Sequence, residues 1–86
     1  MDELERLRKK VDKVDEQILN ALKKRAEICR SIGLVKRKRG MAIVDSSREK
    51  EVYKQAEEKA VEFGLEPLLV GAVFREIVNM CIAVQE

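Results

Sequence analysis

The chain has 86 residues, enough for a single small domain over residues 1–86, and 40% of them are charged against 3% aromatic, so the core must be aliphatic. It contains no histidine, which removes the commonest general base and the commonest metal ligand. Its two cysteines, Cys29 and Cys81, do not form a C-x-x-C pair, so we expect neither a disulfide framework nor a zinc site. Lys and Arg outnumber Asp and Glu over residues 1–39 and the balance reverses over residues 40–86, which is compatible with an anionic ligand, nucleic acid or a solvated surface.

The first 39 residues predict one long helix. Apolar residues recur at spacings of three and four, at Leu4, Leu7, Val11, Val14, Ile18, Ala21, Ile28, Ile32 and Val35. A glycine inside a helix costs only about 1 kcal/mol, so we expect the helix to pass Gly33 and to end near residue 39, before Gly40. The chain is charged from its second residue, which argues against a signal peptide, and no apolar run approaches membrane-spanning length. We therefore expect a cytoplasmic protein that contacts no membrane.

Two shorter helices follow. The second is predicted to start at residues 45–47, where Ser46 and Glu49 fit a capping box, and to end at Gly64. Pro67 suits the first turn of a third helix, whose apolar pattern continues to the end of the chain. No alternating strand pattern appears, so the sequence predicts an all-α fold.

The length of the first helix has a consequence for assembly. About 38 residues at 1.5 Å per residue span about 57 Å, whereas a compact monomer of this size has a radius of gyration of about 12 Å. Two shorter helices cannot cover the whole apolar stripe. Either the first helix breaks near Gly33, or a second chain covers the remainder. We favour an intertwined homodimer in which long helices pack against each other.

Five polar side chains fall on or beside the apolar stripes of the predicted helices, namely Arg8, Arg25, Lys36, Glu49 and Gln85. Each alone has a structural explanation, such as a buried ion pair for Arg25 or half a capping box for Glu49. Together they predict a cationic pocket between facing helices, because a guanidinium in an apolar seam is costly unless an anion meets it. Such a pocket suits a small dianion with a hydroxyl group. It contains no activated nucleophile, so it would bind and polarise its ligand.

The order of these residues resembles a known family. The stretch LRKKVDKVDEQIL, then KRAE, GLVK and DSSRE, and a last helix with Cys81 and Gln85 look like the all-helical class of chorismate mutases over essentially the whole chain. The resemblance implies a three-helix protomer in an intertwined dimer with two active sites, each of which takes one arginine from the partner's first helix. This agrees with the spacing of Arg8 and Arg25, which are about 25 Å apart along one helix and cannot both reach one small ligand.

The resemblance implies five substrate-binding positions. Arg8 of the partner subunit and Arg25 would hold the two carboxylates of chorismate, because guanidinium groups pair with carboxylates through two parallel hydrogen bonds. Arg48 would support the carboxylate end, and the backbone of Asp45 would lie near the ring hydroxyl. Cys81 stands where the family often has serine or another hydrogen-bonding residue. A thiol is a weak donor, so carboxylate binding there is expected to be looser or taken over by backbone or water.

Three further positions are implied to act on the reacting atoms. Lys36 and Gln85 would donate hydrogen bonds to the ether oxygen, and Glu49 would accept one from the ring hydroxyl. The rearrangement of chorismate to prephenate is pericyclic and needs no metal or other cofactor. The enzyme would hold the compact chair-like conformer and stabilise negative charge on the ether oxygen as the C–O bond breaks. We expect Lys36 to contribute most, and Gln85 to lie near a helix end that frays.

Two other functions stay open. Isochorismate pyruvate lyases resemble this fold and use a similar cationic pocket, although Glu49 argues against that activity because those lyases tend to lack the carboxylate. The basic run KRKRG at residues 36–40 is compatible with a nucleic-acid-binding or interaction module, which would show exposed, interchangeable Lys and Arg and steeply salt-dependent binding. No aromatic stacking residues accompany the run. We therefore expect a small-molecule substrate and no nucleic-acid partner.

Overall fold

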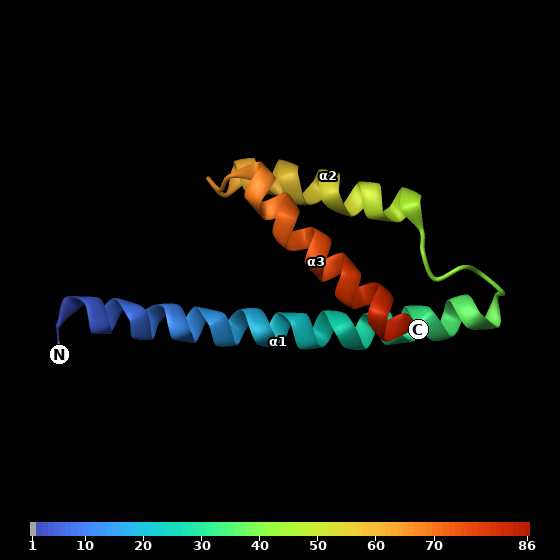
Figure 1. Cartoon of the computed structure of the whole chain (residues 1–86), viewed down its shortest axis with the longest axis horizontal. Helices are drawn as coiled ribbons and strands as arrows, with labels where there is room; N and C mark the ends of the chain where they lie inside the picture. Colours follow the sequence, from blue (N-terminus) through green and yellow to red (C-terminus); the bar gives the residue numbers. More distant parts are fainter. Residues whose placement is uncertain (1) are drawn as a thin grey trace.

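The computed structural model describes residues 2–86 and contains three α-helices joined by two short connections (Figure 1). Helix α1 spans Glu3–Lys38, α2 spans Ser46–Glu62 and α3 spans Pro67–Gln85. No strand occurs within residues 2–86. The predicted all-α fold with a very long first helix is therefore confirmed.

Glycine and proline set the helix ends as predicted. α1 continues through Gly33 without a break and ends just before Gly40, which takes a φ of 65°. Gly64 follows α2 with a φ of 69°, and Pro67 is the first residue of α3. These positive φ values suit glycine because it has no Cβ to clash with the backbone. The alternative of a first helix broken near Gly33 is wrong.

The N-cap of α2 lies one residue before the predicted one, and the predicted capping box of Ser46 and Glu49 does not form. The N-cap is Asp45, whose side chain accepts a hydrogen bond from the backbone N–H of Arg48 at 3.1 Å. Asp45 has extended backbone angles, whereas Ser46 is already helical, so Ser46 cannot act as the cap. Glu49 is therefore released from the capping role that the sequence pattern suggested.

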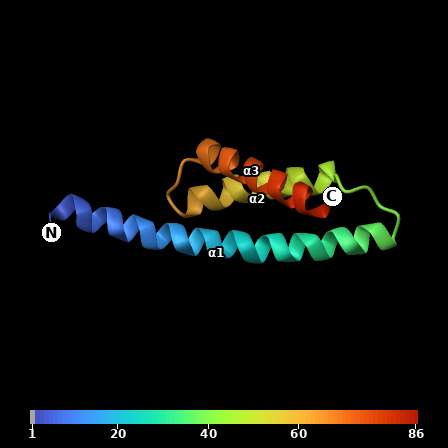
Figure 2. The ribbon, with the colours of Figure 1, turned by 60° about the horizontal axis from the view of Figure 1, so that its bottom comes forward.

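Helix α3 connects the other two helices. It runs from the end of α2 down to the C-terminal half of α1, and α2 makes no packing contact with α1 within residues 2–86 (Figure 1, Figure 2). The N-terminal half of α1 extends beyond both shorter helices. The molecule measures 57 × 24 × 15 Å and its radius of gyration is 16.2 Å, against about 12 Å for a compact chain of this length.

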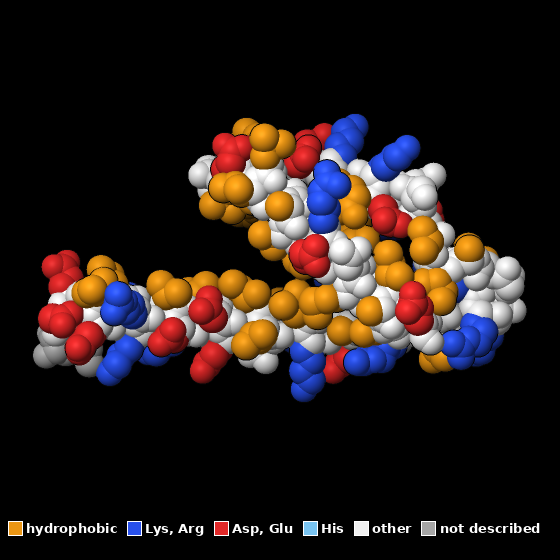
Figure 3. Space-filling view, in the orientation of Figure 1, with side chains coloured by type: hydrophobic (Ala, Val, Ile, Leu, Met, Phe, Trp, Pro, Cys, Tyr) orange, Lys and Arg blue, Asp and Glu red, His pale blue; other side chains and the backbone are white. Residues whose placement is uncertain are grey.

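The core of the single chain is small. Its buried apolar side chains are Cys29, Ala56, Ala60 and Val78, and no large side chain is fully buried within residues 2–86. Every residue from 2 to 21 is exposed. Figure 3 shows apolar side chains following the N-terminal half of α1 along its edge. The apolar stripe that predicted this helix is present, but its N-terminal half is not covered by any other part of residues 2–86.

Helix α3 corrects one expectation from the sequence. It is the most apolar of the three helices, and it is long and apolar enough to cross a membrane by length and composition. The statement that no apolar run approaches membrane-spanning length is therefore wrong. In the structure α3 packs against both other helices and buries Gly71, Val78 and Gln85. Its apolar composition suits the central helix of a helical protein.

Candidate active site

A cavity of about 340 Å³ lies between the three helices, within the range of about 300–1,000 Å³ that is usual for small-ligand sites. Seven of the eight predicted site residues line it: Arg25, Lys36, Asp45, Arg48, Glu49, Cys81 and Gln85. They come from the C-terminal half of α1, the start of α2 and the end of α3. Residues that are up to 60 positions apart in the sequence thus meet at one place.

Helical spacing explains how each element presents its side chains to the cavity. On α1 the lining residues Arg25, Cys29, Ile32 and Lys36 recur every three or four positions and therefore share one face. The first turn of α2 supplies Arg48 and Glu49, directly after the Asp45 cap, and the last turns of α3 supply Val78, Cys81 and Gln85 at the same helical spacing.

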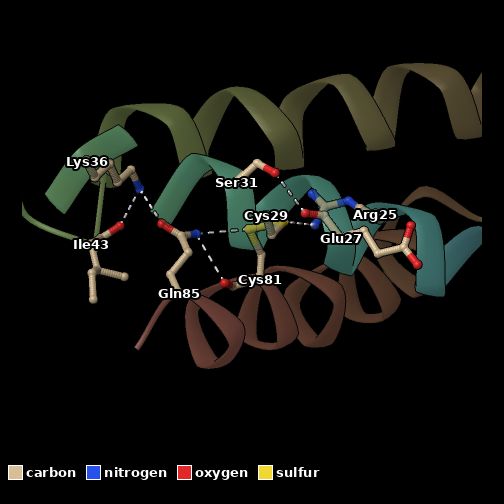
Figure 4. Close-up of a disulfide and its surroundings, with 8 residues drawn as sticks. All are labelled: Arg25, Glu27, Cys29, Ser31, Lys36, Ile43, Cys81 and Gln85. Carbon is tan, nitrogen blue, oxygen red and sulfur yellow. Dashed lines mark hydrogen bonds between the residues drawn. A yellow bond between two sulfur atoms is a disulfide. The ribbon is translucent and has the colours of Figure 1, made fainter. Parts of the chain in front are cut away.

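Lys36 is the most constrained cation of the cavity. Its Nζ donates to the backbone oxygen of Ile43 at 2.6 Å and to Gln85 Oε1 at 2.9 Å (Figure 4). An ammonium group has three N–H donors, so one remains for a ligand. The Ile43 contact was not predictable from the sequence, because a backbone carbonyl can come from any residue type.

Gln85 is buried, with only 6% of its surface exposed. Its Nε2 donates to the backbone oxygen of Cys81 at 3.1 Å and also lies 3.1 Å from Cys81 Sγ (Figure 4). The amide orientation follows from Lys36, because an ammonium only donates and must face the amide oxygen. In this conformation the amide N–H groups point toward Cys81.

Gly33 allows the last turn of α3 to approach α1 closely. A Cβ placed on Gly33 would lie 3.0 Å from Gln85 Cα and 3.0 Å from its Cγ. Such a contact is too short, so any side chain at residue 33 would push Gln85 away. The helical pattern by itself gives Gly33 as a tolerated residue or a possible break, whereas an isolated glycine in such a pattern can also indicate close packing.

The charged residues of the cavity have few partners of their own. Arg25 is half-buried and forms no salt bridge within residues 2–86. Its one side-chain hydrogen bond in this part of the chain is from Nη1 to Cys29 Sγ at 3.7 Å. Glu49 Oε2 is buried and has no hydrogen-bond partner in the described part of the chain. Arg48 pairs with Glu51 at 3.2 Å on the exposed side. A buried carboxylate oxygen without a donor is costly, so Glu49 is prepared to accept a hydrogen bond from a ligand.

The two cysteines correct another expectation. Cys29 of α1 and Cys81 of α3 form a disulfide with their Cα atoms 5.4 Å apart, within the usual range for such a bond. The absence of a C-x-x-C pair argued against a disulfide. This argument failed because the two residues are 52 positions apart and meet only where α3 crosses α1.

Arg8 is the one predicted site residue that lies outside the cavity. It is exposed on the N-terminal half of α1, about 25 Å from Arg25 along the helix axis. Within residues 2–86 no group of His, Cys, Asp and Glu side chains is arranged to hold a metal ion. The lining of the cavity includes three cationic side chains, Arg25, Lys36 and Arg48, together with the Glu49 carboxylate and the Gln85 amide.

An all-α chain with such a cavity has known relatives. Residues 7–86 match the family of chorismate mutase type II, and the chain belongs to this family. It is 34% identical over 89 residues to the bifunctional chorismate mutase/prephenate dehydratase of Aquifex aeolicus, covering 100% of this chain and 25% of that protein. It is 24% identical over 86 residues to the chorismate mutase of Methanocaldococcus jannaschii, covering 100% of this chain and 87% of the relative.

A solved structure supports the fold independently of the curated relatives. The conserved hypothetical protein from Pyrococcus furiosus superposes with a TM-score of 0.80 at 36% sequence identity, over 100% of this chain and 99% of that one. The chain spans about a quarter of the length of several curated relatives that it matches, with 25%, 23% and 21% covered in three of them.

Proposed function

We propose that this chain is a cytoplasmic chorismate mutase, which converts chorismate to prephenate in the biosynthesis of phenylalanine and tyrosine. The observation that carries the proposal is the meeting of Arg25, Lys36, Arg48, Glu49 and Gln85 around one cavity. Chorismate has two carboxylates, a ring hydroxyl and an ether oxygen, and the cavity offers a group of suitable chemistry for each. Membership of the chorismate mutase type II family supports the same substrate.

Binding would use the groups that have no partner within residues 2–86. The guanidinium of Arg25 forms no salt bridge in this described part of the chain, so it would take one carboxylate of the substrate in a bidentate pair. Arg48 would support the carboxylate end from the edge of the cavity, and the backbone of Asp45 would lie near the ring hydroxyl. Glu49 Oε2, which is buried and has no hydrogen-bond partner within residues 2–86, would accept a hydrogen bond from the ring hydroxyl. The presence of this carboxylate favours a mutase over an isochorismate pyruvate lyase.

The chemical step would need only orientation and charge stabilisation. Holding the compact conformer removes rotational freedom before the reaction. As the C–O bond breaks, negative charge grows on the ether oxygen, and the third N–H of Lys36 would stabilise it. One well-placed donor of this kind is worth about 100- to 1,000-fold in rate. No proton needs to be transferred.

Gln85 would supply the second donor after a small change. Its Nε2 carries two N–H groups, one on the Cys81 carbonyl and one directed at Cys81 Sγ. Sulfur is a weak acceptor, so a small rotation of the whole amide can exchange the contact with the sulfur for one with the ether oxygen at little cost. Gln85 Oε1 would stay on Lys36 and keep both donors on the same side of the substrate.

We also propose that the enzyme is a homodimer. The chain exposes 7111 Å², whereas a folded monomer of 9.9 kDa exposes about 5,200 Å². The excess of about 1,900 Å² per chain is typical of a subunit that buries a large homodimer interface. The exposed stripe on the N-terminal half of α1 supports this arrangement. It would bring Arg8 of the partner subunit to the substrate carboxylate that Arg25 does not hold.

Mixing two inactive variants tests the shared site. Arg8→Ala and Arg25→Ala should each be nearly inactive as homodimers. In a heterodimer of the two, one site would regain both arginines and the other would lack both. Random exchange in an equal mixture therefore predicts about a quarter of the wild-type activity. If the mixture stays inactive although exchange is demonstrated by native mass spectrometry, Arg8 does not act across the interface.

The activity itself is tested by following chorismate loss spectrophotometrically with the purified chain. We expect saturable conversion to prephenate without added metal or cofactor. Isochorismate is the matched second substrate, and faster release of pyruvate from isochorismate would identify a lyase instead. Tight, saturable shift of nucleic acid in a gel at low salt, without turnover of either compound, would favour the interaction module.

A further inference from the structure

We propose that Cys29 and Cys81 form a redox-dependent bridge that positions Gln85, a proposal that rests on the chorismate mutase activity proposed above. In the disulfide form the bridge ties the last turns of α3 to α1 and holds the Gln85 amide beside Lys36. In the dithiol form this tie is absent. The bridge would act on the reaction through Gln85, so both cysteines are positioning residues.

The bridge lies one helical turn from the side chain it would position. Cys29 and Gly33 are one turn apart on α1, and Cys81 and Gln85 are one turn apart on α3. The disulfide joins Cys29 to Cys81. One turn further along both helices, Gly33 is in close contact with Gln85. The two helices are thus joined directly beside the turn that carries the amide.

Few other polar interactions hold this turn in place. Every salt bridge within residues 2–86 joins two residues three or four positions apart on one helix, so none links α3 to α1. Apart from the disulfide, the side-chain hydrogen bond between α1 and α3 in the described chain is Lys36 Nζ to Gln85 Oε1 at 2.9 Å. Gln85 is also the last helical residue of α3, where helices fray. The covalent tie therefore has a large share in fixing the amide.

Both sulfurs contact side chains of the site. Cys81 Sγ lies 3.1 Å from Gln85 Nε2, and Cys29 Sγ lies 3.7 Å from Arg25 Nη1. Reduction or formation of the disulfide therefore changes an atom that is in direct contact with the proposed catalytic amide. A reduced Cys81 carries an S–H that competes as a donor for the acceptors around Gln85.

The chemistry of bridge formation is thiol–disulfide exchange with a low-molecular-weight disulfide, RSSR. Cys81 lines the cavity and is half-buried, whereas Cys29 is only 3% exposed. The Cys81 thiolate would attack RSSR from the cavity, giving a mixed disulfide and releasing one RS⁻. The Cys29 thiolate would then attack the Cys81 sulfur and displace the second RS⁻. The two protons lost by the cysteines leave with the two RSH molecules, so the exchange is balanced.

The bridged form should have the higher kcat. Gln85 would act on the ether oxygen only as negative charge develops, so misplacing it lowers transition-state stabilisation. The arginines proposed to bind the carboxylates lie on α1 and α2, and the one contact between them and the bridge within residues 2–86 is the long one from Arg25 Nη1 to Cys29 Sγ, at 3.7 Å. We therefore expect reduction to lower kcat about three- to tenfold, as for the partial loss of one donor, with little change in KM.

The test compares the full chain treated with oxidised glutathione and with a phosphine reductant. Intact mass and thiol alkylation verify each state, the bridged form being lighter by two hydrogens. Amide hydrogen exchange over residues 82–86 is then measured without substrate, and kcat and KM are measured with chorismate. We expect slower exchange and higher kcat in the bridged form. Two variants separate positioning from overall stability. Cys29→Ser should match the reduced wild type and show no redox response. Gln85→Ala should lose the redox response of kcat but keep that of hydrogen exchange.

The outcomes are distinguishable from those of the proposed function. If neither form converts chorismate, the activity is wrong, and hydrogen exchange still shows whether the bridge fixes the last turn of α3. The proposal is overturned if glutathione disulfide never yields the bridged mass, or if the two forms share the same exchange rates and kcat. It is also overturned if Gln85→Ala keeps the full redox response of kcat.

Discussion

The two halves of α1 carry the same kind of apolar stripe and meet different surroundings. In the C-terminal half, α3 covers Cys29 and Gly33, and Arg25 and Lys36 line a cavity. In the N-terminal half, Leu4, Leu7, Val11, Val14 and Ile18 are 46–57% exposed. The helix itself is continuous across both halves.

This contrast separates helix formation from helix burial. Spacing of three and four gives a helix one apolar face, and both halves of α1 satisfy that requirement. What covers the face depends on the rest of the fold: α3 packs on the C-terminal half of α1 and then runs away from it toward α2 (Figure 1). The covered half holds the proposed chemistry, and the uncovered half is the proposed interface that delivers Arg8.

The largest effect is expected from removing the cation of the covered half. Lys36→Ala deletes the donor proposed for the developing charge on the ether oxygen. We expect kcat/KM to fall about 1,000-fold, and the free energy of unfolding to fall by about 1–3 kcal/mol, because the buried Gln85 Oε1 loses its donor. The measurement is steady-state turnover of chorismate together with a thermal melt. Lys24→Ala, an exposed lysine of the same helix, is the matched control and should stay near wild-type. Equal losses in both variants would contradict a specific role for Lys36.

A charge in the uncovered half should break the proposed dimer. Val14→Glu places a carboxylate in the apolar stripe. In a symmetric dimer this carboxylate would be buried once in each subunit, and unpaired buried charge is strongly unfavourable. We expect dissociation by sedimentation velocity. Activity should fall about 100-fold, because the loss of a charged hydrogen-bonded pair with Arg8 costs roughly 1.5–3 kcal/mol. Asn20→Glu introduces the same charge on the opposite face of the helix and should leave the dimer intact. A fully active, monomeric Val14→Glu variant would show that the site is complete within one chain.

A pH profile sharpens the role of the covered half. The Gln85 amide does not titrate, so kcat/KM of the wild type should stay nearly flat from about pH 5 to 9, a range that spans the titration of a perturbed Glu. In Gln85→Glu the protonated acid can donate to the ether oxygen, whereas the carboxylate repels the growing charge. Activity should therefore fall about tenfold or more as the pH rises through the titration of that carboxyl. A flat profile at near-normal rate in the variant would show that residue 85 does not touch the ether oxygen.

The smallest effects test the contact between α1 and α3. Gly33→Ala brings a Cβ to 3.0 Å from the Gln85 backbone. We expect it to lower the free energy of unfolding by about 1–2 kcal/mol, since overpacking exceeds the gain in helix propensity. It should also reduce kcat a few-fold. Gly71→Ala is the matched control, because its Cβ would meet only the flexible side chain of Glu57, with Oε1 at 3.1 Å. That variant should be neutral or stabilised by up to about 1 kcal/mol. Denaturant unfolding measures both, and a stabilised Gly33→Ala would contradict the close approach.

Much of the fold was predictable because its signals are local. Gly40, Gly64 and Pro67 set helix ends through backbone geometry that each residue carries with it. The error at Ser46 was also local: Asp45 and Ser46 are both good caps, and the sequence pattern does not show which one has extended backbone angles. Polar residues on apolar faces gave the candidate site, because burying them without a ligand is costly.

The disulfide and the contacts of Gln85 were not predictable in the same way. Cys29 and Cys81 are 52 residues apart, and their pairing depends on the angle and register at which α3 crosses α1. The same crossing places Gln85 against Gly33 and leaves its amide between Lys36 and Cys81. Neither the angle nor the register is encoded in the periodicity of one helix.

By itself, the sequence determined that this protein has three helices, where they begin and end, and which polar residues face the apolar side. These properties arise from backbone preferences and from a 3.6-residue period that is readable one segment at a time. Only the tertiary structure decided that seven of the eight predicted positions share one cavity, that Arg8 lies outside it, and that the cysteines are joined. The physical reason is that the meeting of distant residues depends on how whole helices pack, and packing is a property of pairs of surfaces that no single segment contains.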